Sequence, residues 1–501
     1  MRLPWEGSGA WPLHVALLAS GASVRSGDAF VSPGSCRHVR HRSMRDSAHR
    51  LPVQLPRRRL FMSSSGAGSA GLQLFNTAGR TKQALLPRHS KRLKFYSCGP
   101  TVYDSAHIGN FRAFLTYDVL KRWLIYRGFE VQHVCNLTDV DDKIIKRMQR
   151  DGVGLRELTD KYAQLFFEDL AALNIIPASC YPRATEHMQD IVEMVQGLMD
   201  KGLAYEMNGS VYFRVSKHEG YGRLSNVQFS GMQDGAGEGG GISDLDEYGG
   251  DKESAKDFAL WKAYKEEDGD VAWDTPLGRG RPGWHIECSA MARKYLGDTV
   301  DIHAGGVDLV FPHHENEVAQ SEAFTGKPFC DCWVHNAFVN VDNEKMSKSK
   351  NNFLTLKGAL PTALDVRAFR YLVVASQYRT ALNFTPEALK GAKNTIKRLD
   401  KFKAALEAVV QSAGDQGEAA ATPAGAQGGG LADAIEKSLT QFEAGMDDDL
   451  NTPRAAAGLF ALVKAGEKAL KASKTSDSGG AGAGGQGGPG GLSAADAGQL
   501  L

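Results

Sequence analysis

A strand–turn–helix–strand unit near residue 100 most constrains how this chain can fold. The segment KFYSCGPTV (Lys94–Val102) is an apolar strand candidate that ends in a Gly-Pro turn. The next segment, FRAFLTYDVLKRWLIYRG, repeats apolar residues at helical spacing and ends at Gly128. Phe129–Leu137 is again apolar and predicts a second strand. Because a strand, a helix and a strand in this order are typical of a parallel sheet, we expect an α/β fold.

The first 62 residues differ in composition from the rest of the 501-residue chain. They hold ten Arg, no Lys and three acidic residues, which gives +7, whereas the whole chain has a net charge of +1. Segments rich in Arg and Ser and poor in acids are typical of organelle-targeting peptides. We therefore expect residues 1–62 to be a disordered transit peptide for the mitochondrion or plastid, with a cytoplasmic protein as the alternative if translation starts at Met62.

Composition excludes several other classes of protein. The hydrophobic fraction of 42% is that of a globular protein, and no apolar run reaches the ~18 residues of a membrane span. Seven cysteines in a chain of this length do not make a disulfide scaffold. We expect no membrane partner.

The segment His107-Ile-Gly-Asn110 (HIGN) lies between the first strand and the helix. A helix N-terminus at this place offers N–H groups and partial positive charge, which suit phosphates. Gly109 would let a flat base approach the backbone, and the side chains of His107 and Asn110 can donate hydrogen bonds. The alternative is a histidine that only caps the helix, and these four residues alone favour it.

A second motif, KMSKS, begins at Lys345 and is followed by more Lys, Ser and Asn. Lys345 and Lys348, three residues apart on a polar loop, can place positive charge against a phosphate on which negative charge develops during a reaction. A solvated basic loop is the alternative. The occurrence of both motifs in one chain favours phosphate chemistry.

Four further residues have side chains that can bind a metal ion. Cys98 follows the first strand, Cys288 lies in GRPGWHIECSAM, and His313 and Glu317 lie in FPHHENE, four residues apart and therefore on one face of a helix. Two thiols, an imidazole and a carboxylate are a reasonable tetrahedral zinc set. Ordinary packing for each cysteine and a polar helix face for HHENE are the alternatives, since spacing does not show that Cys98 meets the other three.

These segments carry a family resemblance. HIGN and KMSKS resemble the two signature motifs of class I aminoacyl-tRNA synthetases, with Asn110 at the last position of the HIGH motif. The segments SCGPTVYDSAHIGN, NLTDVDDKIIKR, DFALWK, GRPGWHIECSAM and DIHAGGVDLVFPHHENE resemble the cysteinyl-tRNA synthetases in the order of that family. The resemblance covers Phe95 to Leu399, and we find no segment that resembles the family's small anticodon-binding domain.

The resemblance implies a Rossmann-like parallel-sheet catalytic domain with an inserted connective domain, followed by an α-helical bundle. The expected boundaries are 90–185 and 276–360 for the two halves of the catalytic domain, 186–275 for the insert, 361–474 for a tRNA-contacting bundle with a linker at 411–430, and 475–501 for a low-complexity tail.

The resemblance also implies the activity and the site. We expect ATP-dependent activation of L-cysteine to cysteinyl-adenylate and its transfer to tRNA(Cys), by a monomer that binds one Zn²⁺ and uses ATP with Mg²⁺. The implied residues are the zinc ligands Cys98, Cys288, His313 and Glu317, the cysteine-binding Thr138, Trp284 and Asp308, the ATP-binding Gly109, Gly305, Gly306 and Lys348, and the catalytic His107, Asn110, Lys345 and Lys348. Two alternatives are a cysteine:amino-sugar ligase and a non-catalytic tRNA-binding relative.

Overall fold

The computed structural model describes residues 71–89, 91–226, 252–254, 256–346, 353–415, 429–477 and 494–501. The predicted transit peptide (1–62) and Lys348 lie outside the described residues. Among the helices that are described, none combines the length and the apolar character needed to cross a membrane.

A four-stranded parallel sheet forms the centre of the catalytic domain. Its strands follow the order β11–β10–β3–β4, with bounds β3 (Arg92–Ser97), β4 (Glu130–Cys135), β10 (Val300–Gly306) and β11 (Cys330–Asn336). The chain from β3 to β4 passes through α2 (Ile108–Tyr126), which is the predicted strand–helix–strand unit. The prediction of a parallel α/β fold is therefore confirmed.

Helices cover both faces of this sheet. Phe95 and Ile302 belong to the apolar core that contains α2, whereas their neighbours in the sheet, Tyr96 and Val134, belong to a second core that contains α7 (Trp284–Leu296). Because side chains alternate between the two faces of a strand, cover on both faces explains why successive residues are buried at the ends of β3 (Phe95–Ser97) and β4 (His133–Cys135).

The insert carries its own antiparallel sheet and precedes α7. The strand order is β5–β6–β7–β9–β8, with bounds β5 (Ala204–Met207), β6 (Ser210–Phe213), β7 (Phe258–Ala263), β8 (Trp273–Thr275) and β9 (Gly278–Pro282). The predicted boundary at residue 275 falls inside the β8–β9 hairpin, so the insert extends to Pro282. The other helices of the catalytic domain and insert are α3 (Asp142–Asp151), α4 (Leu155–Ala172), α5 (Met188–Asp200) and α8 (Glu315–Thr325).

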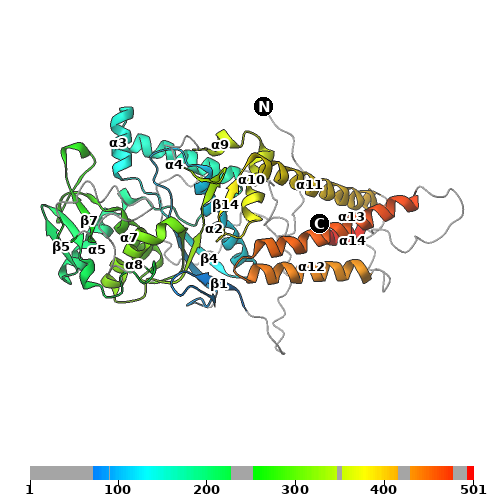
Figure 1. Cartoon of the computed structure of the whole chain (residues 1–501), viewed down its shortest axis with the longest axis horizontal. Coiled ribbons are helices and arrows are strands. Elements are labelled where there is room, and N and C mark those ends of the chain that lie inside the picture. The colour runs from blue at the N-terminus through cyan, green and yellow to red at the C-terminus, as the bar shows by residue number, and fades with distance from the viewer. Residues whose placement is uncertain are drawn as a thin grey trace, which may run out of the picture.

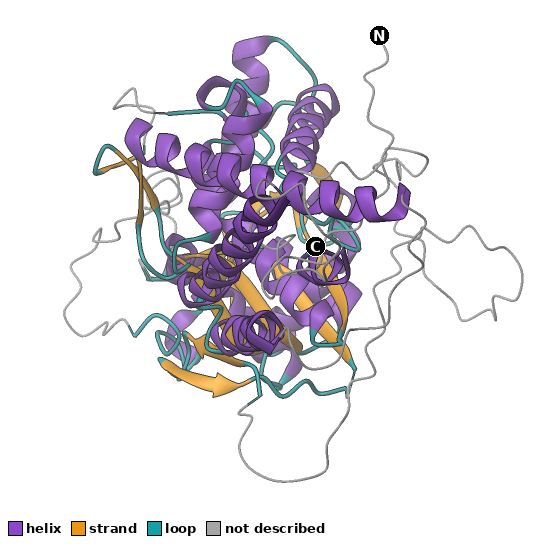
Figure 2. Cartoon of the chain, turned by 90° about the vertical axis from the view of Figure 1, so that its right-hand side faces the viewer, coloured by secondary structure: helices purple, strands orange, loops and turns teal. Residues whose placement is uncertain are grey.

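Long helices extend from the side of the catalytic domain opposite to the insert (Figure 1). A small sheet of order β13–β12–β14 lies where they begin, and β1 and β2 form an N-terminal hairpin. The bounds are β1 (Gln73–Asn76), β2 (Thr81–Ala84), β12 (Val339–Val341), β13 (Glu344–Lys345), β14 (Leu382–Phe384), α9 (Leu356–Ala359), α10 (Ala363–Val374), α11 (Pro386–Asp415), α12 (Gly429–Asp447), α13 (Thr452–Asp477) and α14 (Ala494–Leu500). Figure 2 shows the long helices end-on in front of the sheet.

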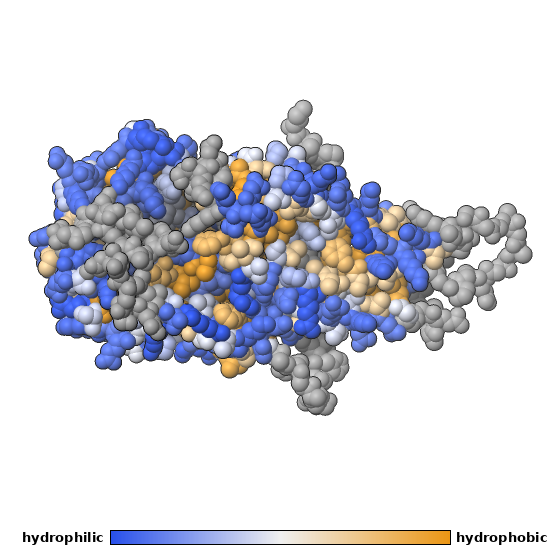
Figure 3. All heavy atoms as spheres, in the orientation of Figure 1, coloured by the Kyte–Doolittle hydropathy of each residue, from blue (hydrophilic) through white to orange (hydrophobic). Residues whose placement is uncertain are grey.

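The helical bundle differs from the sequence expectation at its ends. The helices α11 and α12 extend into both ends of the predicted linker 411–430, and α13 continues to Asp477. Within the predicted tail 475–501, α14 packs on the bundle because Ala497 and Leu500 are buried beside Leu406. On the face shown in Figure 3, polar residues predominate at the insert end, while apolar residues gather over the middle of the molecule.

Candidate metal centre and nucleotide-binding motifs

The HIGN motif forms the start of α2. His107 is the N-cap, and its Nδ1 accepts a hydrogen bond from the backbone N–H of Asn110 at 3.3 Å. The Asn110 side-chain oxygen in turn accepts from the backbone N–H of His107 at 3.0 Å. These reciprocal bonds make a capping box, so the helix-capping interpretation of His107 is correct as far as its local structure goes. The remaining N–H groups of the first turn keep their partial positive charge.

The two signature motifs lie next to each other in space. The backbone N–H of Ile108 donates to the carbonyl of Leu354 at 2.9 Å, just after the KMSKS segment. A Cβ built on Gly109 would lie 3.7 Å from Cε of Met346, the second residue of KMSKS. Lys345 is the last residue of β13, whose pairing with β12 ties the motif to the end of β11. The predicted pairing of two sequence-distant motifs is therefore present, although Lys348 lies outside the described residues.

The predicted metal ligands meet at the carboxyl end of β3. Sγ of Cys98 lies 3.6 Å from Oε1 of Glu317, and the same oxygen lies 3.0 Å from Nε2 of His313. Cys288, on α7, lies within hydrogen-bonding reach of both Cys98 and His313. All four residues are buried, with exposed fractions of at most 7%. The fold thus brings Cys98 to the other three residues across 190 residues of sequence.

Several charges are close together among these donors. A hydrogen bond from Cys98 lowers the pKa of the Cys288 thiol to about 6, while burial raises the pKa of Cys98. Burial would raise the pKa of Glu317, but the charges of His303 and His313 lower it to about 2. Buried anionic sulfur and oxygen donors are stabilised by a divalent cation, so the chemistry of this donor set fits the predicted zinc ion.

His314 is an additional donor that the sequence analysis did not select. Its Nε2 lies 3.2 Å from Sγ of Cys98, and the ligand atoms of Cys98, His313, His314 and Glu317 all lie within 4.8 Å of one another. The Nδ1 of His314 is hydrogen-bonded to Nε2 of His335 at 2.7 Å. Adjacent residues of a helix point to different faces, so helical spacing did not indicate His314 as a donor beside His313. The backbone is kinked ahead of the two histidines, at Phe311, whose φ of −138° and ψ of 133° are not helical.

Other histidines orient the donors. His303 Nε2 pairs with Oε2 of Glu317 at 2.9 Å, and the His303 ring stacks on Trp333 with centroids 4.5 Å apart. Nδ1 of His285 faces Nδ1 of His313 at 3.0 Å. These partners hold the donor side chains in place. The sequence analysis missed them, although His285 and His303 lie inside the quoted motifs.

The predicted cysteine-binding residues take three different positions. The Trp284 ring stacks on the His313 ring with centroids 4.2 Å apart, so it forms part of the wall of the metal centre. Thr138 is buried, and its hydroxyl donates to Glu287 at 3.1 Å. Asp308 lies exposed in the turn after β10. The direct contacts of these residues with cysteine remain predictions.

Gly305 is required by the packing of the protein itself, whereas the neighbour of Gly306 is an exposed side chain that can move. A Cβ on Gly305 would lie 2.3 Å from Cε1 of His314, and one on Gly306 would lie 2.4 Å from Oδ1 of Asp308. Gly305 therefore makes room for the histidine beside the metal centre. The prediction that these two glycines approach a nucleotide remains untested.

Glu315 links the metal centre to the insert. This buried carboxylate accepts hydrogen bonds from Gly222 N, Ser225 N and Ser225 Oγ at 2.7 to 2.8 Å. The loop that it holds contributes Leu224 to the apolar cluster that contains Cys98 and Cys288. Glu315 thus closes one wall of the candidate metal centre.

We expect Glu315→Ala to lower the free energy of unfolding by about 2–4 kcal/mol, because it leaves buried N–H and O–H donors without an acceptor. Urea denaturation measures this loss, and limited proteolysis reports whether the 220–226 loop opens first. Glu157→Ala, which removes an exposed carboxylate on α4, is the control and should cost less than about 0.5 kcal/mol. Equal effects for the two variants would contradict the role of Glu315.

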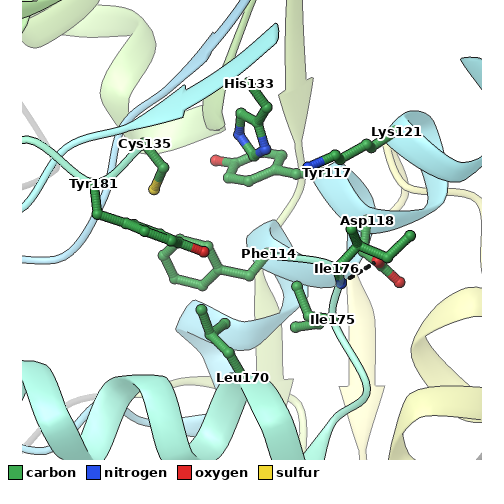
Figure 4. Close-up of a pocket in the computed structure, with 10 residues that line it drawn as sticks. All are labelled: Phe114, Tyr117, Asp118, Lys121, His133, Cys135, Leu170, Ile175, Ile176 and Tyr181. Carbon is green, nitrogen blue, oxygen red and sulfur yellow. Dashed lines mark hydrogen bonds between the residues drawn. The ribbon is translucent and has the colours of Figure 1, made fainter. Parts of the chain in front are cut away.

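A small cavity lies away from these motifs, between α2, β4 and α4 (Figure 4). It measures about 10 Å³ and is lined by Phe114, Tyr117, Asp118, Lys121, His133, Cys135, Leu170, Ile175, Ile176 and Tyr181. This volume holds about one water molecule. The cavity is therefore too small to be a substrate site.

A parallel α/β sheet with HIGN at the start of its first crossover helix and KMSKS beside it defines the class I aminoacyl-tRNA synthetases. The fold is similar to that of Mycobacterium tuberculosis methionyl-tRNA synthetase in complex with methionyl-adenylate, with a TM-score of 0.59 and 14% identity, over 78% of this chain and 86% of that one. A second structure of that enzyme bound by methionyl-adenylate has the same TM-score and covers 82% of this chain and 88% of the other.

The model of the tRNA synthetases class I (C) catalytic domain matches residues 84–394, and that of the DALR domain matches residues 441–483. Cysteine--tRNA ligase from Bacillus licheniformis is 44% identical over 78% of this chain and 80% of that protein. Cysteine--tRNA ligase from Staphylococcus carnosus is 44% identical over 79% of this chain and 81% of that protein. With matches of this extent, the chain belongs to the cysteine--tRNA ligase family of class I synthetases.

Proposed function

We propose that this chain activates L-cysteine with ATP and transfers it to tRNA(Cys). The observation that carries the proposal is the buried Cys98–Cys288–His313–Glu317 donor set, which lies at the same end of the sheet as the HIGN helix in a chain 44% identical to cysteine--tRNA ligases.

The reaction has two steps. The cysteine carboxylate attacks the α-phosphate of ATP, which forms cysteinyl-adenylate and releases pyrophosphate with its Mg²⁺. A terminal ribose hydroxyl of the tRNA then attacks the acyl carbon and releases AMP. The chain's contribution is positioning and electrostatic stabilisation, because no covalent bond to the enzyme is required.

Particular residues serve the first step. The N–H groups at the start of α2 would bind phosphate oxygens, and the capping box of His107 and Asn110 fixes their direction. Lys345 and Lys348 would stabilise the charge that develops on the departing pyrophosphate. Gly109 would lie against the adenine, beside Met346.

The donor set would select the amino acid. Cys98, Cys288, His313 and Glu317 would hold one Zn²⁺, with Trp284 stacked on His313. Bound zinc lowers the pKa of a thiol and prefers sulfur to a hydroxyl oxygen, so cysteine would be favoured over serine. Polar recognition of this kind can discriminate by about 10⁴. The pocket then needs no separate editing site.

We expect cysteine-dependent ATP–pyrophosphate exchange with residues 62–501, and no exchange above background with serine, because only the thiol gains from the metal. Zinc measured in the same sample should be about one per chain. Absence of exchange in folded, zinc-containing protein would contradict the proposal.

Two alternatives predict different results. A cysteine:amino-sugar ligase would pass the activated cysteine to a sugar amine, and the bundle α10–α13 with its DALR match argues for tRNA instead. A non-catalytic tRNA-binding relative would show no exchange, and the presence of all four metal donors and both loop lysines argues against it.

For location we propose the mitochondrion or plastid, which import of the full chain into isolated organelles would test.

A further inference from the structure

The turn between α12 and α13 joins the helical bundle to the catalytic domain. It contains three consecutive aspartates, Asp447, Asp448 and Asp449, of which Asp449 has no exposed surface. Its backbone has φ of 58°, in the left-handed region that non-glycine residues seldom adopt. A buried charge in an unfavourable backbone conformation persists only where its surroundings hold it firmly.

Asp449 receives hydrogen bonds from two separate parts of the catalytic domain. Oδ1 accepts from the backbone N–H of Phe75 in β1 at 2.8 Å and from the hydroxyl of Tyr378 at 2.6 Å. Oδ2 accepts from Nε of Arg379 at 2.8 Å and from its Nη2 at 2.7 Å. The Asp449 backbone N–H also donates to the carbonyl of Gln73. One carboxylate thus ties the bundle to the N-terminal hairpin and to the segment before β14.

The neighbouring aspartates make further contacts. Asp447 accepts hydrogen bonds from Nε1 of Trp123 at 3.0 Å and from Nη2 of Arg127 at 2.7 Å, both at the C-terminal end of α2. Asp448 pairs with Lys82 at the surface, where each side chain is more than a third exposed. The three carboxylates therefore contact α2, the hairpin and the segment before β14.

The segment before β14, which holds Asp449, is also bound to the HIGN helix. Arg112, buried on the first turns of α2, donates to the carbonyls of Gln377, Tyr378 and Thr380. The same segment leads into β14, which pairs with β12 ahead of the KMSKS motif. The residues that hold Asp449 are consequently part of the frame that carries both signature motifs.

We propose that Asp449 is a positioning residue that sets the orientation of the α12–α13 bundle relative to the adenylate site, so that the tRNA end reaches the activated cysteine. This inference rests on the proposed function. On the neighbouring helix α11, the exposed Lys390, Lys397 and Lys401 follow one side at helical spacing, which suits a phosphate backbone. A tilt of the bundle at its anchored end would move such a bound backbone away from the site.

The test compares the two half-reactions in Asp449→Asn. Cysteine-dependent ATP–pyrophosphate exchange needs no tRNA, so its kcat and its KM for cysteine should remain within about twofold of wild type. Transfer of cysteine from the purified enzyme–adenylate complex to tRNA(Cys), measured in a single turnover, should slow by about tenfold or more. Asp448→Asn, which changes the adjacent, exposed carboxylate, is the matched control and should affect neither step.

A parallel loss of exchange and transfer would overturn the inference, because it would make Asp449 a general support of the fold. Unchanged transfer would overturn it as well. If Asp449→Asn does not fold, Tyr378→Phe removes one hydrogen bond to the same oxygen and should also slow transfer selectively. Failure of the wild-type chain to support exchange would instead refute the proposed function.

Discussion

Cys288→Ser should reduce bound zinc from about one per chain to a small fraction, with zinc affinity lowered by at least about 100-fold. The serine hydroxyl is a harder metal donor than the thiol and a much weaker acid. It therefore does not replace a thiolate at the buried donor set around Cys98 and His313. Cysteine-dependent exchange should fall with the zinc content. Metal analysis after dialysis against a chelator, together with the exchange assay, measures both effects.

Cys330→Ser is the matched control, because Cys330 lies on β11 with its thiol near the carbonyl of Cys332. It should retain zinc and exchange. His314→Gln distinguishes two donor sets, since His314 contacts Cys98 at 3.2 Å. Retention of zinc by Cys288→Ser together with its loss in His314→Gln would contradict the predicted ligands and place His314 in the set instead of Cys288.

Arg370→Met should destabilise the chain by about 3–5 kcal/mol, which urea denaturation at pH 7 would show. Nη2 of Arg370 on α10 lies 2.6 Å from Oδ2 of Asp118 on α2, and both side chains are at most 3% exposed. The substitution leaves Asp118 buried with a weaker set of partners, Arg122 and the backbone N–H of Ile176. It also weakens the contact between the HIGN helix and the bundle.

The pH dependence of this effect follows from the pKa of Asp118. Burial raises that pKa, but the charges of Arg370 and Arg122 lower it below its ordinary value. A carboxyl whose pKa is lowered in the folded state stabilises the protein above its unfolded pKa, and this contribution is lost as the pH falls through the folded value. The difference in stability between wild type and Arg370→Met should therefore be largest near neutral pH and shrink below about pH 4.

Arg398→Met is the control for this prediction. Arg398 also joins two helices, through a pair with Glu467 at 2.8 Å, but the side chains are 47% and 34% exposed. An exposed pair contributes at most about 1 kcal/mol. A loss of the same size in both variants would contradict the special role of the buried pair, whereas Asp118→Asn combined with Arg370→Met should recover part of the stability.

The sequence by itself determined the parallel α/β unit and supplied the candidate residues of the site. The apolar runs on either side of the α2 segment specify buried strands, because only a sheet covered on both faces buries successive side chains. HIGN and KMSKS, with Cys98, Cys288, His313 and Glu317, are the candidate site residues, and they occur in the order of the family. Local residue preferences and motif spacing encode these features, and neither depends on long-range packing.

Only the tertiary structure decided which distant residues meet. Cys98 contacts Glu317, which lies 219 residues further along the chain, and His314 lies beside Cys98 although helical periodicity does not predict it there. The sequence does not show that Glu315 and Asp449 are buried, yet both carboxylates receive hydrogen bonds from remote backbone N–H groups. Sequence patterns report the exposure expected for a residue type. The burial of these charges depends on partners far along the chain, and only the folded arrangement supplies them.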